Sequence, residues 1–350
     1  MGEQSAIPDL SALKVLTGGR DPGAAAAELG RCSAGDGLPL VAPTADRVRA
    51  MLAGQAPESP VAPLPPLMMS ATAEDVAVCA VLAGCAPGWL RFIAAALEAA
   101  AAPEFNLLGI STTTGNAAVG VILHGPGPVR LGAAGGPGCL GPSAITAAVG
   151  RAVALSGRLL GGALPGTLDM ATVGQPAKLS MCLAEPVPPA GWTALHVARG
   201  CPPGSDAVTV FGASGIIEVA DTSSDSGQGL LETLAAATPL PAGVSSDGTV
   251  LGGGQQLFVL PPEWVTRLVA DGCTRETAAA FMYEHAVLPL DRLPTSARFR
   301  LSDDVWRAGQ LRSARSAADV LFVCAGGPGV KAAYLPSWPG GSTAVTRAVG

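Results

Sequence analysis

The residues best suited to chemistry lie in the middle of the chain. Lys178, one of three lysines, precedes Cys182 by four residues. Because side chains alternate along a strand, a strand here would place Lys178, Ser180 and Cys182 on one face. A neighbouring lysine lowers the pKa of a thiol and also pairs with anionic substrates. The spacing therefore predicts a catalytic Lys178–Cys182 pair. The alternative is a strand-edge lysine beside a core cysteine.

Two carboxylates and two of the three histidines complete the predicted catalytic set. Asp169 and Glu185 flank the same segment and are the expected acid/base or orienting groups. The alternative is a helix cap and a solvated strand end. His124 ends an apolar run beside Gly-Pro-Gly, where a side chain would face a ligand, and His196 is an expected substrate contact. His285 is expected to be structural. Since no two histidines have metal-ligand spacing, no metal site is predicted.

Glycine-rich loops are the second predicted source of ligand contacts. The loop at 132–141 leads into a helix expected to open at Pro142, and a helix N-terminus attracts phosphate or carboxylate groups. It lacks the spacing of a dinucleotide or nucleotide loop, so a plain connector is the alternative and no organic cofactor is expected. The predicted substrate contacts are Thr112, Thr113, Thr114, Asn116, Gly136, Gly138, His196, Gly326 and Gly327.

Composition narrows the class of protein. Of 350 residues, 49% are hydrophobic and only 14% charged, as in a globular chain and not a disordered one. A net charge of −6 argues against nucleic-acid binding. The eight cysteines are scattered without C-x-x-C, as expected for reduced, mostly buried thiols. Without a signal-peptide pattern or a long apolar span, we expect a cytoplasmic protein that contacts no membrane. The low charge and apolar helical faces predict a homodimer.

Elements that would position these residues can be read from periodicity and caps. Strands alternating with helices predict an α/β fold with two similar lobes, mixed or mostly parallel sheets and flanking helices. The expected helices are 44–54, 72–84, 88–101, 142–156, 227–237, 261–272 and 274–286. The expected strands are 107–112, 117–124, 179–183, 207–211, 257–260 and 319–324.

The predicted organisation has three parts. Residues 1–40 form a poorly ordered arm, 41–190 a first α/β lobe with the glycine-rich loop, and 191–350 a second α/β lobe. Because ligands of open α/β sheets bind at the carboxyl ends of strands, the site is expected between the lobes. The loops expected to face this one cleft are 111–116, 135–141 and 325–329.

Motifs centred on glycine and proline recur through the chain. They are Ala83-Gly-Cys85-x-Pro87, Gly141-Pro142, Gly150-Arg151-Ala152, Gly161-Gly162-Ala163-x-Pro165-Gly166, Asp169, Gly174-Gln175-Pro176-x-Lys178, Cys182-x-Ala-Glu185, Leu195-His196-Val197-x-Arg199-Gly200 and Ala325-Gly-Gly-Pro-Gly329. From about Thr44 to the C-terminus, this pattern resembles a poorly characterised bacterial family associated with the partner region of UGSC-type (seleno)proteins. The resemblance implies no established reaction. The family has histidine where this chain has Val173, acidic residues where it has Pro186-Val-Pro, and Lys-His where it has Val330-Lys331. These departures from the family pattern imply an altered or specialised activity here.

Three functions remain open from the sequence. The first is a cofactor-independent small-molecule enzyme of bacterial specialised metabolism: a lyase, isomerase, hydratase or cyclase acting on a polar or carboxylate-bearing substrate in an inter-lobe cleft. The second is a thiol- or metal-handling redox protein in which Cys182, Cys139 and Cys85 converge. The third is a non-catalytic partner protein.

Overall fold

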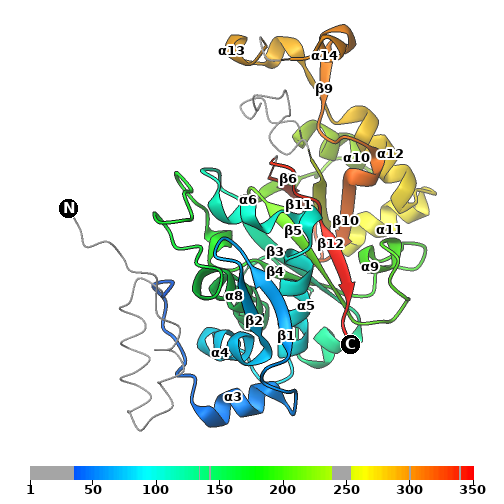
Figure 1. The fold of residues 1–350 in the computed structure, drawn as a ribbon. Helices are drawn as coiled ribbons and strands as arrows, with labels where there is room; N and C mark the ends of the chain where they lie inside the picture. The colour runs from blue at the N-terminus through cyan, green and yellow to red at the C-terminus, as the bar shows by residue number, and fades with distance from the viewer. Residues whose placement is uncertain (1–34, 134, 142, 239–253, 299–300, 339) are drawn as a thin grey trace.

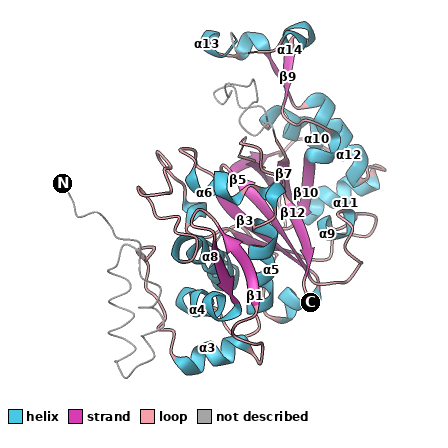
Figure 2. Cartoon of the chain, viewed as in Figure 1, coloured by secondary structure: helices cyan, strands magenta, loops and turns pink. Residues whose placement is uncertain are grey.

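Two four-stranded sheets form the centre of the molecule (Figures 1 and 2). The structure is a computed structural model that describes residues 35–133, 135–141, 143–238, 254–298, 301–338 and 340–350. In the first sheet the order is β12 (Val345–Ala348), β5 (Ala207–Ala213), β3 (Ala118–His124) and β4 (Cys182–Glu185). In the second it is β10 (Val320–Cys324), β7 (Gln256–Leu260), β11 (Lys331–Pro336) and β6 (Ile217–Ala220).

Both sheets are mixed. In the first, β3 runs parallel to β4 and antiparallel to β5, which in turn is antiparallel to β12. In the second, β7 runs parallel to β10, and β11 is antiparallel to both β7 and β6. Each sheet therefore contains one parallel pair beside antiparallel strands. The predicted α/β class with mixed sheets and flanking helices is confirmed.

Helices cover the outer face of each sheet, and the inner faces pack on each other (Figure 1). The helices on the first sheet are α4 (Ala73–Ala83), α5 (Leu90–Ala100) and α8 (Ala144–Leu159). Those on the second are α10 (Gly227–Ala237), α11 (Pro262–Ala270) and α12 (Arg275–His285). The resulting order of layers is helices, sheet, sheet, helices.

Strand β3 shows why the central strands are almost continuously apolar. Val121 and Leu123 pack against the helices, whereas Ile122 points to the other face and packs in the core shared by the two sheets. Strand β7 does the same, with Phe258 on its helices and Val259 between the sheets. A strand buried on both faces has few positions for a polar side chain, and these need a hydrogen-bond partner.

Shorter elements complete the chain. They are α3 (Ala45–Leu52), β1 (Pro60–Leu64), β2 (Met69–Thr72), α6 (Leu107–Thr112), α7 (Pro126–Arg130), a 3-10 turn η2 (Pro176–Lys178), α9 (Leu195–Ala198), β8 (Val287–Pro289), α13 (Thr295–Arg298), α14 (Asp303–Ala308) and β9 (Gln310–Arg312). Strands β8 and β9 pair, and with α13 and α14 they extend away from the sheets at the top of Figure 1. In the described residues, no helix has the length and apolarity needed to span a membrane.

Local signals predicted several helix ends. The Thr72 hydroxyl accepts the Asp75 N–H while the Asp75 carboxylate accepts the Thr72 N–H, and Gly84 closes α4 with φ of 87°. Thr274 and Thr277 form the same reciprocal pair at the start of α12, and the Thr44 side chain caps α3 by accepting the Arg47 N–H. Pro142, expected in the first turn of α8, lies outside the described residues, and the helix begins at Ala144.

One predicted strand is wrong, and another is shifted along the chain. Residues 107–112 form helix α6, because Asn106 adopts a left-handed conformation and its side chain accepts the Gly109 N–H, which starts a helix. The predicted strand at 179–183 begins only at Cys182, after the 3-10 turn that ends at Lys178. In both places a local capping or turn geometry replaces the extended chain that apolar residues suggested.

The chain does not divide between the sheets at residue 190. Strands β5 and β12 come from the predicted second lobe, yet both pair within the first sheet. Most of the predicted arm, residues 1–34, lies outside the described residues. The described end of that segment is bound to α8, since both Asp36 carboxylate oxygens accept hydrogen bonds from Arg151, at 2.5 and 2.8 Å.

Candidate functional site

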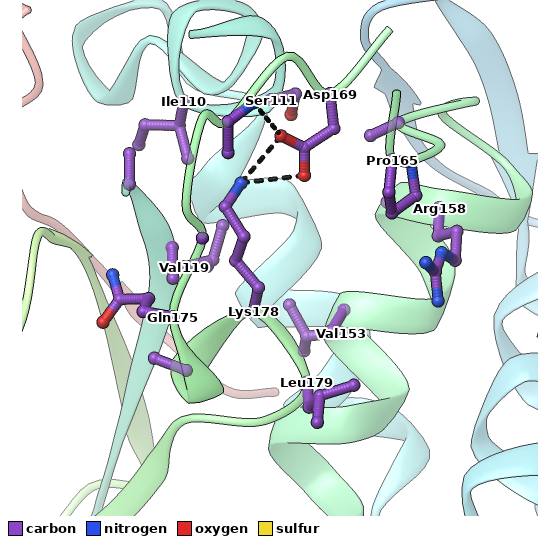
Figure 3. A pocket seen from close by; sticks show the side chains of 18 of the residues that line it. Ile110, Ser111, Val119, Val153, Arg158, Pro165, Asp169, Gln175, Lys178 and Leu179 are labelled. Carbon is purple, nitrogen blue, oxygen red and sulfur yellow. Dashed lines mark hydrogen bonds and ion pairs between the residues drawn. The ribbon is translucent and has the colours of Figure 1, made fainter. Parts of the chain in front are cut away.

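A cavity of about 620 Å³ lies at the amino ends of β3 and β4 (Figure 3). Helices α5, α6 and α8 form part of its wall, and the rest comes from Asp36, residues 117–119 and the segment from 163 to 179. Most lining side chains are apolar, among them Ile110, Val119, Val153 and Leu179. Volumes of this order accommodate a small organic molecule and bury most of its surface.

A lysine–aspartate pair is built into this wall. The Lys178 ammonium donates to both Asp169 carboxylate oxygens, at 2.9 and 2.8 Å, and Asp169 also accepts the Ala171 N–H at 3.1 Å (Figure 3). The Lys178 and Asp169 side chains are only 20% and 13% exposed. Such an arrangement provides a fixed cation and a fixed proton acceptor side by side.

Arg158 adds a second cation to the cavity. It follows Val153 by five residues on α8 and donates to the Gly35 carbonyl at 2.9 Å. Burial lowers the pKa of its guanidinium, while Asp36 and Asp169 raise it. Since arginine starts from a pKa above 12, the group stays charged at neutral pH.

Gln175, Ser111 and Asp36, whose carboxylate is bound to Arg151, are the remaining polar side chains in the wall. The Gln175 amide donates to the carbonyls of Asn116 and Ala213, which fixes the chain just before Lys178. Ser111 is buried at the end of α6. Lys178 and Asp169 were predicted site residues, whereas Arg158, Ser111 and Gln175 were not. A second arginine seven residues after Arg151 on one helix is the signal that points to Arg158.

Cys182 is not the partner of Lys178. Lys178 ends a 3-10 turn, so strand alternation does not extend to it, and its amine is bound to Asp169. The Cys182 side chain is 6% exposed and packs between the first sheet and its helices. Burial raises the pKa of the Cys182 thiol, and the nearby Cys85 raises it further. The expected pairing of Lys178 with Cys182 is therefore wrong, and Asp169 takes the place of the cysteine.

His124, Glu185 and His196 meet in a buried cluster at the opposite ends of the same strands. His124 Nδ1 lies 3.0 Å from Glu185 Oε2, and the His124 and His196 rings stack with centroids 4.9 Å apart. The atoms that could bind a metal lie within 4.8 Å of one another. The structure thus joins three predicted residues, but away from Lys178 and Asp169.

The surroundings of this cluster are hydrogen-bonded. Glu185 accepts the backbone N–H groups of Leu195 at 2.8 Å and Cys324 at 3.1 Å. His124 Nε2 lies 2.9 Å from Thr209 Oγ1, which bonds to Thr346 at 2.8 Å. The surroundings of His196 act on its pKa in both directions. Burial lowers the pKa of the imidazole and the neighbouring His124 lowers it further, whereas Glu185 raises it.

The predicted ligand loops divide between these two ends. The Gly326 N–H donates to the Gly135 carbonyl at 2.7 Å, so the loops at 135–141 and 325–329 meet beyond the carboxyl end of β4. The loop at 111–116 instead precedes β3 and contacts the segment before Lys178. One cleft shared by all three loops is therefore not formed.

None of the predicted substrate contacts in these loops lines the cavity. Thr112 donates to the Leu108 carbonyl at 2.8 Å, and the Thr113 hydroxyl accepts the Gly115 N–H at 3.0 Å. The Thr114 carbonyl accepts the Thr172 N–H at 2.9 Å. These groups serve the turn between α6 and β3. The remaining predicted contacts, Asn116, Gly136, Gly138, His196, Gly326 and Gly327, are likewise not among the lining residues.

Comparisons of the chain with protein-family models, with curated proteins and with solved structures found no match.

Proposed function

We propose that the chain is a small-molecule enzyme of the lyase, isomerase, hydratase or cyclase type, and that it acts in the cavity that contains Lys178 and Asp169. The substrate class is a small compound with one carboxylate and an apolar body. The observation that carries the proposal is the partly buried Lys178–Asp169 pair in a wall that is otherwise mostly apolar. Active sites commonly combine an apolar pocket with a few converging charged groups.

The pair supports proton transfer next to a carboxylate. The Asp169 carboxylate is the group that would accept a proton from a carbon adjacent to the substrate carboxylate or ketone. Lys178 and Arg158 supply positive charge for the substrate carboxylate and for the negative charge that develops on the neighbouring oxygen. Returning the proton to another position gives isomerisation, and loss of a leaving group gives elimination. These reactions need no organic cofactor.

A binding experiment tests the substrate class. Hexanoate and benzoate are the anionic probes, with hexanol and benzyl alcohol as neutral counterparts, and NMR titration measures affinity. Wild type should prefer the anions, and Lys178→Met should remove that preference while keeping the apolar stem. Lys331→Met is the matched control. Lys331 forms an exposed pair with Glu218, and neither residue is among those that line the cavity. Equal affinity of wild type for acids and alcohols would reject the substrate class.

A proton-exchange experiment tests the reaction class. In D₂O, 2-oxohexanoate exchanges its C3 hydrogens slowly, and the enzyme should accelerate this exchange over buffer. Asp169→Asn should lower the rate of enzyme-catalysed exchange by about 10²-fold or more, the usual contribution of a positioned base. Probe binding without any acceleration would favour the alternative of a non-catalytic binding protein.

The thiol-handling alternative has less support. Cys139 lies in the core between the sheets, whereas Cys182 lies between the first sheet and its helices. Burial raises the pKa of the Cys85 thiol to about 12 and also raises that of Cys139. A thiol that stays protonated is a poor nucleophile.

The expected homodimer, the cytoplasmic location and the absence of nucleic-acid partners stay predictions. Light scattering at micromolar concentration tests the first, and a monomer mass would reject it.

A further inference from the structure

The cluster of His124, Glu185 and His196 is assembled by the sheet and not by sequence spacing. His124 and Glu185 are the last residues of two parallel strands and face each other in register. The Leu195 N–H donates to Glu185 Oε2 at 2.8 Å, which places the start of α9, and with it His196, over the strand ends. Three segments therefore deliver two imidazoles and one carboxylate to one buried point.

His196 is the residue that this arrangement does not satisfy. Its side chain is 6% exposed, and neither Nδ1 nor Nε2 has a hydrogen-bond partner in the part of the chain that the structure describes. Burying polar nitrogens without a hydrogen-bond partner lowers the stability of the fold. If this side chain only filled space, an apolar ring would be more stable there. The ring stacks on His124 with an interplanar angle of 28°, so its nitrogens lie close to those of His124.

We propose that His124, Glu185 and His196 bind one divalent transition-metal ion of the Zn²⁺ class. Two histidines and one carboxylate form a recurrent ligand set for zinc and for non-haem iron, with further coordination positions open. The candidate ligand atoms lie within 4.8 Å of one another, and rotation of the His196 ring out of its stack on His124 would direct all three to one ion. The site is distinct from the cavity, because it lies at the carboxyl ends of β3 and β4 and the cavity lies at their amino ends.

The groups around the cluster favour this role. A metal on His124 Nδ1 requires the ring proton on Nε2, and Thr209 Oγ1 lies 2.9 Å from Nε2 to accept it. Thr209 can in turn donate to Thr346, 2.8 Å away, which also accepts from Arg199. Such outer hydrogen bonds orient metal-binding histidines and fix their tautomer.

The carboxylate is oriented in a similar way. Glu185 Oε1 accepts the Cys324 N–H at 3.1 Å and lies 3.8 Å from the Arg275 guanidinium. Arg275 itself donates to the carbonyls of Thr193 and Phe322. The Arg275 guanidinium is therefore held near Oε1, whereas Oε2 is the oxygen that faces His124.

Zinc titration of the full-length protein tests the proposal. After removal of bound metals with a chelator, calorimetry should show one Zn²⁺ per chain. His196→Ala and His196→Phe should each weaken binding at least about a hundredfold, and the Phe variant keeps an aromatic ring in the stack. Thr209→Val should weaken it by about 10- to 100-fold, the usual effect of losing an outer partner. His285→Ala is the matched control, since His285 is exposed and bonds to the Phe281 carbonyl.

Cobalt substitution identifies the ligands. Co²⁺ bound by nitrogen and oxygen should give visible d–d absorption without a thiolate charge-transfer band. A thiolate band would assign the metal to cysteines and overturn the proposal. So would a failure of wild type to bind Zn²⁺, or equal affinity in wild type and both His196 variants. Lys178→Met should bind Zn²⁺ like wild type, so this outcome is independent of the proposed reaction in the cavity.

Discussion

His124 Nδ1 and Glu185 Oε2 lie 3.0 Å apart at the ends of two adjacent parallel strands, and both side chains are inaccessible to solvent. Glu185 also accepts two backbone N–H groups, from Leu195 and Cys324. One carboxylate thus connects β3, β4, α9 and β10, and it joins the first sheet to the second.

Replacing this carboxylate is expected to be costly. Glu185→Ala leaves the His124 ring and two buried N–H groups without an acceptor, so the free energy of unfolding should fall by about 3–5 kcal/mol. Urea denaturation measures the change. The control is Glu218→Ala, which removes an exposed partner of Lys331 and should cost less than about 1 kcal/mol. Similar losses in the two variants would contradict a connecting role for Glu185.

Two glycines of α8 should respond in opposite directions to alanine. A Cβ at Gly157 meets no atom within 4 Å, so Gly157→Ala should stabilise the protein by up to about 1 kcal/mol through helix propensity. A Cβ at Gly150 would lie 2.5 Å from Ser180 Oγ and 2.9 Å from the Met181 backbone nitrogen. Gly150→Ala should therefore destabilise by roughly 1–3 kcal/mol. Thermal unfolding of both variants checks the sign, and stabilisation by Gly150→Ala would refute the close packing of α8 on Ser180 and Met181, just before β4.

Cys182 should behave as a core residue. Because its thiol is buried and its pKa raised, iodoacetamide should label the half-buried Cys201 and Cys273 well before Cys182 in the folded protein. Mass spectrometry of digested samples measures each rate. Cys182→Ala should lower the free energy of unfolding by roughly 0.5–3 kcal/mol and leave probe binding in the cavity unchanged. Rapid labelling of Cys182 would instead support the nucleophile that the sequence suggested.

Asp221 should make stability depend on pH. Its carboxylate accepts hydrogen bonds from Thr233, Ser224 and Ser223, which hold its pKa below the usual value near 4. A group whose pKa is lower in the folded state stabilises that state above its unfolded pKa, and this contribution is lost as pH falls. Wild type should therefore exceed Asp221→Asn in stability at pH 7, and the gap should narrow below about pH 4.

Denaturation curves of both proteins between pH 7 and pH 2.5 provide the measurement. Asp46→Asn is the control, because Asp46 is exposed and pairs with the exposed Arg49 on the same helix. A gap for Asp221→Asn that stayed constant with pH would show that its hydrogen bonds do not favour the ionised form.

Local sequence determined the elements whose signals are short-range. The apolar run of β3 and the caps at Thr72 and Gly84 act within a few residues, so periodicity and capping chemistry predict them without knowledge of the fold. Lys178 and Asp169 were also identified from composition and position. The α/β class with mixed sheets followed from the alternation of such elements.

Only the tertiary structure decided which of these residues meet. Lys178 binds Asp169 and not Cys182, because a 3-10 turn interrupts the expected strand. His124 meets Glu185 and His196 because β3 and β4 pair in parallel and α9 returns over their ends. Strand order and register depend on many weak contacts between distant segments. The spacing of residues along the sequence does not indicate strand order or register, so the sequence alone did not predict the histidine cluster.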